Sequence, residues 1–333
     1  MDNLTHTLLA VTMSRAGLNR LTPYATGLLA LGANAPDVDV VSRLGSTINY
    51  LEHHRGITHS LVASPVMAAA VAGTFWLLHR SRRAQQPFHF APAFVMALAG
   101  ALSHLLLDFS TQYGTRLLLP FSGRWLAWDI MPIVDIWVLV LLAACLVLPF
   151  LFHLVSEEIG AARTPVRPWA IFALAAMAFW FGLRDFSHRR AVAIVDSHIY
   201  RDREPLRVGA FPDLVNPFLW HGVVETGATM ELVEVNLFEE FDPTRARTYW
   251  PPDPHPALDA ARKTRAARVF QDFAAYPFTY VDRAEKGYEV VFRDLRFDYG
   301  VTGRRGFVAR VALDENLRVL RESFHFQDSE PAR

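Results

Sequence analysis

Long apolar segments in the first half of the chain constrain its fold more than any other feature. Four of them approach the roughly 17–25 residues that an α-helix needs to cross the hydrocarbon core of a bilayer. They cover residues 61–79, 91–109, 133–154 and 168–184. Two earlier apolar segments, 4–14 and 22–34, are shorter, so by length they could form a re-entrant hairpin rather than two full crossings. We therefore expect residues 1–185 to form a polytopic membrane bundle of about four to six apolar helices.

After about residue 190 the sequence pattern changes. Residues 232–237, 288–295 and 306–313 alternate in part between apolar and polar side chains, as β-strands with one buried face do. Residues 257–275 have the pattern of one amphipathic helix. We expect a mainly α fold class, in which the membrane helical bundle is followed by a soluble β-rich (α+β) domain over residues 190–333.

Charge and cysteine content exclude several classes of protein. The 33 basic and 33 acidic side chains balance, so we expect no nucleic-acid partner. The single cysteine, Cys145, lies inside an apolar segment and cannot be part of a disulfide framework. The first residues lack the basic region of a signal peptide, so we expect them to be retained.

Arginines between the apolar segments predict an orientation. They occur in three loops, as Arg15 and Arg20, as Arg80, Arg82 and Arg83, and as Arg163 and Arg167. If every segment crosses, the three loops lie on one side, which the positive-inside rule assigns to the cytoplasm. Arg184, Arg189 and Arg190 run against this assignment, since they follow the last segment on the external side. We expect a multi-pass protein of the cytoplasmic (inner) membrane whose C-terminal domain is extracytoplasmic.

Histidine and aspartate residues gather at the ends of the apolar segments, all on the predicted extracytoplasmic side. His104 and Asp108 are four residues apart in a helical context, so both side chains project from one face. A His–Asp pair that only satisfies itself is the alternative. Asp37 and Asp39 follow a proline, and there one carboxylate could bind a metal while the other holds a ligand histidine or caps the next element.

Residues 52–60 place three histidines and an arginine directly before an apolar segment. His53, His54 and His59 cannot all face one ion, and we select His59 and His54 as candidate ligands. The planar guanidinium of Arg55 suits an anionic substrate such as a phosphate. Arg116, in the loop after Asp108, could bind an oxyanion or shape the loop.

Asp135 is a further candidate because it lies just inside an apolar segment, where an unpaired carboxylate is unfavourable. It could complete a second metal position or pair with Arg124. His6, near the start of the chain, is a weak signal alone. The full set of candidate metal ligands is His6, Asp37, Asp39, His54, His59, His104, Asp108 and Asp135.

Such donors predict a divalent metal, one or two Zn²⁺, bound at the membrane face. In a hydrolytic site, Asp37 or Asp39 would act as general base, and Arg55 or Arg116 would offset charge on the leaving group. A site at the level of the headgroups suits a membrane lipid, or another amphiphile with a phosphoester or ester bond. The predicted function is therefore metal-dependent hydrolysis.

The same residues carry a resemblance to known families. His6 and the segments 36–39, 54–60, 103–108 and 111–122 resemble the YdjM-type family of inner-membrane, predicted metal-dependent hydrolases, which has SOS-regulated members; the likeness covers about residues 1–155. The order of donors is also similar to that in the zinc-dependent phospholipase C and single-strand nuclease superfamily. That likeness implies metal ligands at His6, Asp37 or Asp39, His59, His104 and Asp108. The chain departs from the superfamily because no later His-x-x-x-Glu or His-x-x-x-Asp clearly completes the set, for which Asp129 and Asp135 are only possible substitutes. We therefore expect two metal ions rather than three.

Two other functions are compatible with intramembrane His and Asp residues. A metal-ion or proton transporter would carry such residues deep in several segments. Here the mid-segment positions 66–76 and 138–148 contain none, which disfavours transport. A non-catalytic scaffold would bind a partner through its C-terminal domain and hold a fully ligated structural metal.

Overall fold

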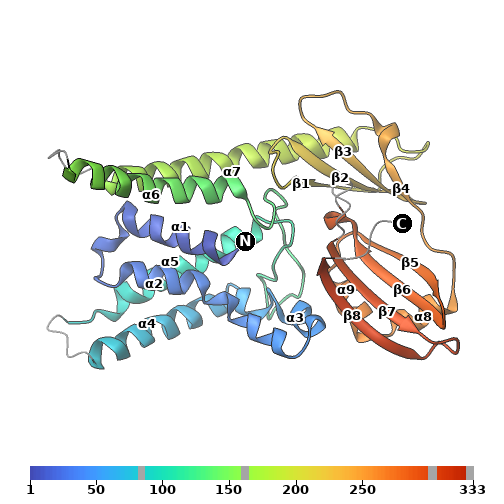
Figure 1. Cartoon of the computed structure of the whole chain (residues 1–333), viewed down its shortest axis with the longest axis horizontal. Coiled ribbons are helices and arrows are strands. Elements are labelled where there is room, and N and C mark those ends of the chain that lie inside the picture. The colour runs from blue at the N-terminus through green and yellow to red at the C-terminus, as the bar shows by residue number, and fades with distance from the viewer. Residues whose placement is uncertain (82–86, 159–164, 299–305, 328–333) are drawn as a thin grey trace. The chain divides into compact units, whose positions relative to one another are not determined.

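The computed structural model describes residues 1–81, 87–158, 165–298 and 306–327 of the 333-residue chain. Their contacts divide the chain into two compact units. The first unit comprises Met1–Asp39 and Arg55–Phe186, and the second comprises Val40–His54 and Ser187–Arg333. Helices build the first unit, and both β-sheets belong to the second (Figure 1). The expected fold class, helical with a β-rich C-terminal part, is confirmed.

The helices of the first unit run roughly alongside one another (Figure 1). In chain order they are α1 (Asn3–Ala16), η1 (Leu18–Arg20), α2 (Ala25–Asn34), η3 (Ile57–His59), α4 (Ala63–Ser81), α5 (Phe90–Phe109) and α6 (Ile136–Glu158), with the short helix η2 (Pro36–Leu44) and the long α7 (Val166–Asp196) continuing into the second unit. Asp2 caps α1 by accepting a hydrogen bond from the backbone N–H of Thr5 at 3.0 Å. Gly17, with a φ of 143°, ends the same helix.

Helices α2 and α5 approach each other at two glycines. A Cβ atom on Gly32 would overlap the carbonyl oxygen of Ala97, and one on Gly100 would overlap that of Leu29. Small residues that let helix backbones approach this closely are common in membrane bundles. The approach brings the end of α2 against the face of α5 that carries the candidate ligands.

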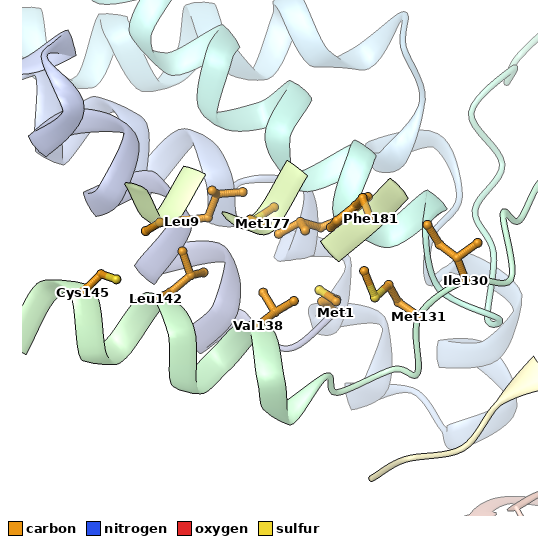
Figure 2. Packing of buried hydrophobic residues seen from close by; sticks show 11 residues of the cluster. Met1, Leu9, Ile130, Met131, Val138, Leu142, Cys145, Met177 and Phe181 are labelled. Atoms are coloured by element: carbon orange, nitrogen blue, oxygen red, sulfur yellow. The ribbon is translucent and has the colours of Figure 1, made fainter. Parts of the chain in front are cut away.

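A buried apolar cluster lies between α1, α5, α6 and α7. Leu9, Leu107, Leu142 and Met177 pack there with other buried apolar side chains, as Figure 2 shows for the labelled residues. Cys145 is part of this cluster and is only 4% exposed, so it is a packing residue.

Two helices in the described part of the chain, α5 and α7, are long and apolar enough to cross a membrane. Thr47–His59 and Ala63–Ser81 pass the same test only when taken together, as a broken span or a re-entrant loop, and Ile136–Phe152 of α6 is apolar but shorter. These helices support a membrane protein, as expected. The number of crossings and the orientation stay predictions, and Arg82, Arg83 and Arg163 lie outside the described residues.

Two four-stranded antiparallel sheets dominate the second unit. The first contains β1 (Arg207–Pro212), β2 (Leu219–Glu225), β3 (Met230–Asn236) and β4 (Arg247–Tyr249) in that order. The second contains β5 (Pro277–Ala284), β6 (Gly287–Asp294), β7 (Gly306–Leu313) and β8 (Val319–Gln327), also in chain order. Val195, near the end of α7, packs on the first sheet against the buried Trp220 and Val233. The strands expected at 232–237, 288–295 and 306–313 are confirmed as β3, β6 and β7.

The described part of the second unit also contains five short helices, and one expectation about them is corrected. The helices are α3 (Thr47–His53), η4 (Pro243–Arg245), α8 (Pro256–Arg262), α9 (Arg265–Phe273) and η5 (Leu295–Phe297). The single helix expected over 257–275 is wrong, because α8 ends before Thr264 and α9 starts after it. Thr264 is the cap of α9, since its hydroxyl accepts from the N–H of Ala267 at 3.3 Å. Arg265 of α9 forms an ion pair with Glu52 of α3.

Candidate metal centre

Helix α5 places His104 and Asp108 on one face, one turn apart. Their Nε2 and Oδ2 atoms are 3.3 Å apart, and both side chains are buried. His104 Nδ1 lies 2.6 Å from the carbonyl oxygen of Ala33 in α2. A carbonyl can only accept, so Nδ1 of the neutral ring carries the proton and Nε2 presents a lone pair to the centre.

His59, in the short helix η3, meets His104 from the other side. Its Nδ1 lies 3.2 Å from Asp39 Oδ2, so a neutral His59 also keeps its proton on Nδ1. The two Nε2 atoms of His59 and His104 are 3.1 Å apart. Two lone pairs cannot face each other at this distance without a proton or a cation between them. The carboxylates of Asp37 and Asp108 stabilise a positive charge at this point, whether a proton or a metal ion carries it.

Asp37 completes a group of four. Its Oδ1 is 3.4 Å from His59 Nε2 and 3.7 Å from His104 Nε2. One donor atom from each of Asp37, His59, His104 and Asp108 lies within 4.8 Å of all the others. The side chain of Asp37 is 17% exposed, whereas the other three are 1% or less, so Asp37 is the member nearest to solvent.

Asn3 and the histidines control the orientation and the ionisation of the Asp37 carboxylate. The side-chain amide of Asn3 donates to Asp37 Oδ2 at 3.0 Å, which directs Oδ1 toward the imidazoles. Burial by itself would raise the pKa of Asp37, but the hydrogen bond with His59 and the electrostatic interaction with His104 outweigh it and hold the pKa below its usual value. Asp37 is therefore an anionic donor at neutral pH.

His6 is the observation that best tests whether a metal fits. The side chain is fully buried, and in the described part of the chain neither ring nitrogen makes a hydrogen bond. Its ring stacks on His104 with centroids 3.8 Å apart, and its Nε2 is 3.4 Å from Asp108 Oδ1. A buried imidazole without a hydrogen bond is unfavourable unless it has another partner. Imidazole and carboxylate donors in this number fit Zn²⁺ or a similar ion.

The sequence predicts that the Arg55 guanidinium binds an anionic substrate, but in the structure it lies against other parts of the protein. It is 3% exposed, and its guanidinium donates to Asp108 Oδ1 at 3.0 Å and to Thr111 Oγ1 at 2.9 Å. It also lies over the ring of Tyr113, with Cζ 4.5 Å from the centroid. The amino group of Met1 contacts the same oxygen of Asp108. These contacts position Asp108 and leave the guanidinium directed into the protein.

Four other predicted residues lie outside this donor group. Asp39 accepts hydrogen bonds from the backbone N–H of Arg55 at 2.9 Å and from the Thr58 hydroxyl at 3.2 Å, so it holds the ligand-bearing segment as well as His59. Asp135 is buried and caps α6 by accepting from the N–H groups of Trp137 and Val138, both at 2.9 Å.

His54 and Arg116 each have an aromatic neighbour. His54 belongs to the second unit, where its ring stacks on Tyr50 at 4.4 Å. Arg116 is partly buried and lies 4.6 Å from the ring centroid of Trp125.

Sequence reasoning missed two groups that orient the donors, Asn3 and the carbonyl of Ala33. A backbone carbonyl has no signature in the sequence. Asn3 precedes His6 by three residues on the same helix, and this spacing places both on one face, so it was a usable signal.

Comparison with known proteins gives matches to both parts of the chain. The model of a family described as YdjM inner membrane protein matches residues 1–191. A second model, the YfhP C-terminal alpha/beta plait domain, matches residues 256–331. The curated protein called "Uncharacterized protein YfhP", from Bacillus subtilis (strain 168), is 25% identical over an alignment of 341 residues. The match covers 96% of this chain and 93% of that protein. No solved structure matches the chain.

Proposed function

Because the chain belongs to the YdjM inner membrane protein family, and because its donors converge in a buried centre, we propose that it is a membrane-bound metal-dependent hydrolase. The observation that carries this proposal is the facing pair of Nε2 atoms on His59 and His104, 3.1 Å apart, with both Nδ1 atoms directed at oxygen acceptors. Metal-binding histidines in enzymes are oriented in the same way, by an acceptor at the second ring nitrogen.

Asp37, His59, His104 and Asp108 would hold the metal, one or two Zn²⁺-type ions, and His6 is the next donor in reach. When bound, such an ion lowers the pKa of a bound water from 15.7 to about 7 and polarises a phosphoryl or ester oxygen. The protein supplies the remaining functions through groups that are already in place.

Asp37 is the residue that we assign as general base. It is ionised, it is the most exposed member of the donor group, and Asn3 fixes the orientation of its carboxylate. A carboxylate in this position can take a proton from an attacking water. Asp39 orients His59, and Arg55 holds Asp108 while it offsets negative charge in the buried part of the site.

The substrate class follows from the setting. We propose a phosphoester or ester of a membrane lipid or similar amphiphile, with the site at the extracytoplasmic face of a multi-pass inner-membrane protein. Nucleic acid is not an expected partner, because the net charge is zero.

Metal analysis of purified variants tests the proposal. Detergent-purified wild type should contain about one or two equivalents of a divalent metal, and a His59→Ala/His104→Ala double variant should contain none. His53→Ala is the matched control, because His53 is exposed in the same segment and its Nδ1 bonds to the Asn49 carbonyl at 2.9 Å.

Wild type and control should then hydrolyse at least one member of a panel of lipids and soluble phosphodiesters, and the double variant should hydrolyse none. Full metal content in the double variant would refute the ligand assignment. Metal in the wild type without hydrolysis of any panel member would favour a structural metal in a scaffold.

A further inference from the structure

Two segments beside the metal centre lie next to each other and share hydrogen bonds. One is residues 55–62, and the other is the loop 116–122. The N–H of Leu61 donates to the carbonyl of Leu117 at 3.0 Å, and the N–H of Arg116 donates to the carbonyl of Arg55 at 3.1 Å. The loop is therefore attached to the segment that carries His59.

These two segments expose apolar side chains on their outer side. Phe121 is 86% exposed, and four others are between 43% and 53% exposed: Ile57, Leu61, Val62 and Leu118. Single exposed apolar residues are ordinary on soluble proteins, but a group of five on adjoining segments indicates contact with an apolar phase or partner. We call these five residues the apolar edge. The same segments bury Arg55 and His59, so their inner side serves the metal centre.

The backbone of the loop is suited to a non-aqueous setting. The N–H groups of Leu119, Phe121 and Ser122 donate to carbonyls within the loop at 2.9–3.3 Å, and Pro120 has no N–H. Irregular backbone is tolerated near hydrocarbon only when its polar groups are satisfied by the protein.

The apolar edge is continuous with a helix whose outer surface is also apolar. Val62 directly precedes α4, on which Val66 is 69% and Leu77 is 60% exposed. Trp125, beside Arg116, is an amphipathic side chain of the kind enriched at membrane–water interfaces. Since α4 passes as part of a candidate membrane segment together with Thr47–His59, this continuity points to bilayer lipid as the occupant.

We propose that the apolar edge lies in the bilayer interface and is the side from which a membrane lipid reaches the metal centre. Acyl chains would contact Leu118 and Phe121 while the headgroup enters beside Asp37. The contact with lipid stands on the exposed residues alone, whereas the entry of a substrate rests on the proposed function.

Site-directed spin labelling tests the contact with lipid directly. The native cysteine is replaced by Cys145→Ala, and a label is placed at Phe121→Cys in vesicles of phosphatidylethanolamine and phosphatidylglycerol. Collisions with oxygen, which concentrates in the bilayer, are compared with collisions with a water-soluble nickel chelate. Lys286→Cys is the control, because Lys286 is exposed in the turn between β5 and β6.

At position 121 we expect oxygen collisions to exceed nickel collisions, with the opposite order at position 286. Equal nickel access at the two positions would overturn the proposal, because residue 121 would then lie in water. Low access to both reagents at position 121 would also overturn it, because protein rather than lipid would cover the edge.

A second measurement tests entry of the substrate. In a Leu118→Ser/Phe121→Ser variant, the ratio of activity on a long-chain lipid to activity on its short-chain analogue should fall roughly tenfold or more, because apolar contact with the chains is lost. Metal content should stay at the wild-type value, and Leu320→Ser, an exposed leucine in β8, should leave the ratio unchanged. An unchanged ratio in the double variant would refute lipid entry. If wild type hydrolyses nothing, the proposed function fails while the spin-label result still decides the contact.

Discussion

His59 and His104 each direct Nδ1 at an oxygen that accepts a hydrogen bond, and these two oxygens determine what the centre can bind. Asp39 Oδ2 accepts from His59, and the Ala33 carbonyl accepts from His104. Both Nε2 atoms are thereby prepared as ligands before any ion arrives, so little reorganisation accompanies binding. The residues that orient the donors are therefore as important to affinity as the donors themselves.

The Asp39→Ala variant tests this at the residue scale. It should weaken metal binding about 10–100-fold without abolishing it, because His59 loses the acceptor that fixes its ring and tautomer. Metal affinity is measured by competition with a chromophoric chelator. Loss as complete as in His59→Ala would instead assign Asp39 as a ligand, and unchanged affinity would contradict its orienting role.

The residues of the donor group could be predicted from the sequence, but their division of labour could not. Histidine and aspartate at the ends of apolar segments are conspicuous, because such groups are unfavourable there without a partner. The choice between Asp37 and Asp39 depends on the tertiary fold, since both occupy one turn. The inward position of Arg55 depends on Thr111 and Asp108, more than fifty residues away.

Helices α2 and α5 are the elements that set the geometry of the centre. Gly32 and Gly100 allow their backbones to approach, and this approach puts the Ala33 carbonyl within 2.6 Å of His104. A side chain at either glycine would force the helices apart and lengthen this hydrogen bond.

Gly100→Ala is the corresponding test. The added Cβ meets backbone atoms of α2, so we expect destabilisation of about 1–3 kcal/mol together with weaker metal binding. Gly73→Ala in α4 is the control, because among the described residues no atom beyond the neighbouring backbone of α4 lies within 4 Å of the position of its Cβ. That variant should be neutral or slightly stabilising, by up to about 1 kcal/mol, since alanine is the better helix former. Thermal unfolding in detergent measures both, and equal effects of the two substitutions would contradict the role of the close approach.

Helices and strands with a clear hydrophobic period could be predicted from the sequence. A helix boundary that depends on one capping residue could not. Long apolar segments and alternating strands have distinct periods that survive in the structure. The break between α8 and α9 depends on the single hydroxyl of Thr264, which a search for amphipathic periodicity does not detect.

For the whole molecule, the relative from Bacillus subtilis matches both units, whereas the likeness seen in the motifs covered only the helical part. Motif reasoning stopped there because the ligand residues lie in the first unit, while the second unit carries none of the four donors. The β-rich character of the second unit could nevertheless be predicted from the alternation of apolar and polar residues, which does not depend on functional residues.

Metal removal should affect the stability of the whole chain. An ion that binds the native state at one hundred times its Kd stabilises it by about 2.7 kcal/mol, so a chelator should lower the unfolding temperature of the wild type in detergent. The His59→Ala/His104→Ala variant should unfold at a temperature that the chelator does not change. An equal shift in both proteins would show that the chelator acts elsewhere.

The near-complete enclosure of His59, His104 and Asp108 also has a kinetic consequence. An ion held by these groups would leave past Asp37, the most exposed of the four donors, so exchange with the medium would be slow and a chelator would need prolonged incubation to remove the ion. The metal found in a purified sample would then record the supply in the cell when the chain matured, and growth in defined media would be the way to identify the native ion.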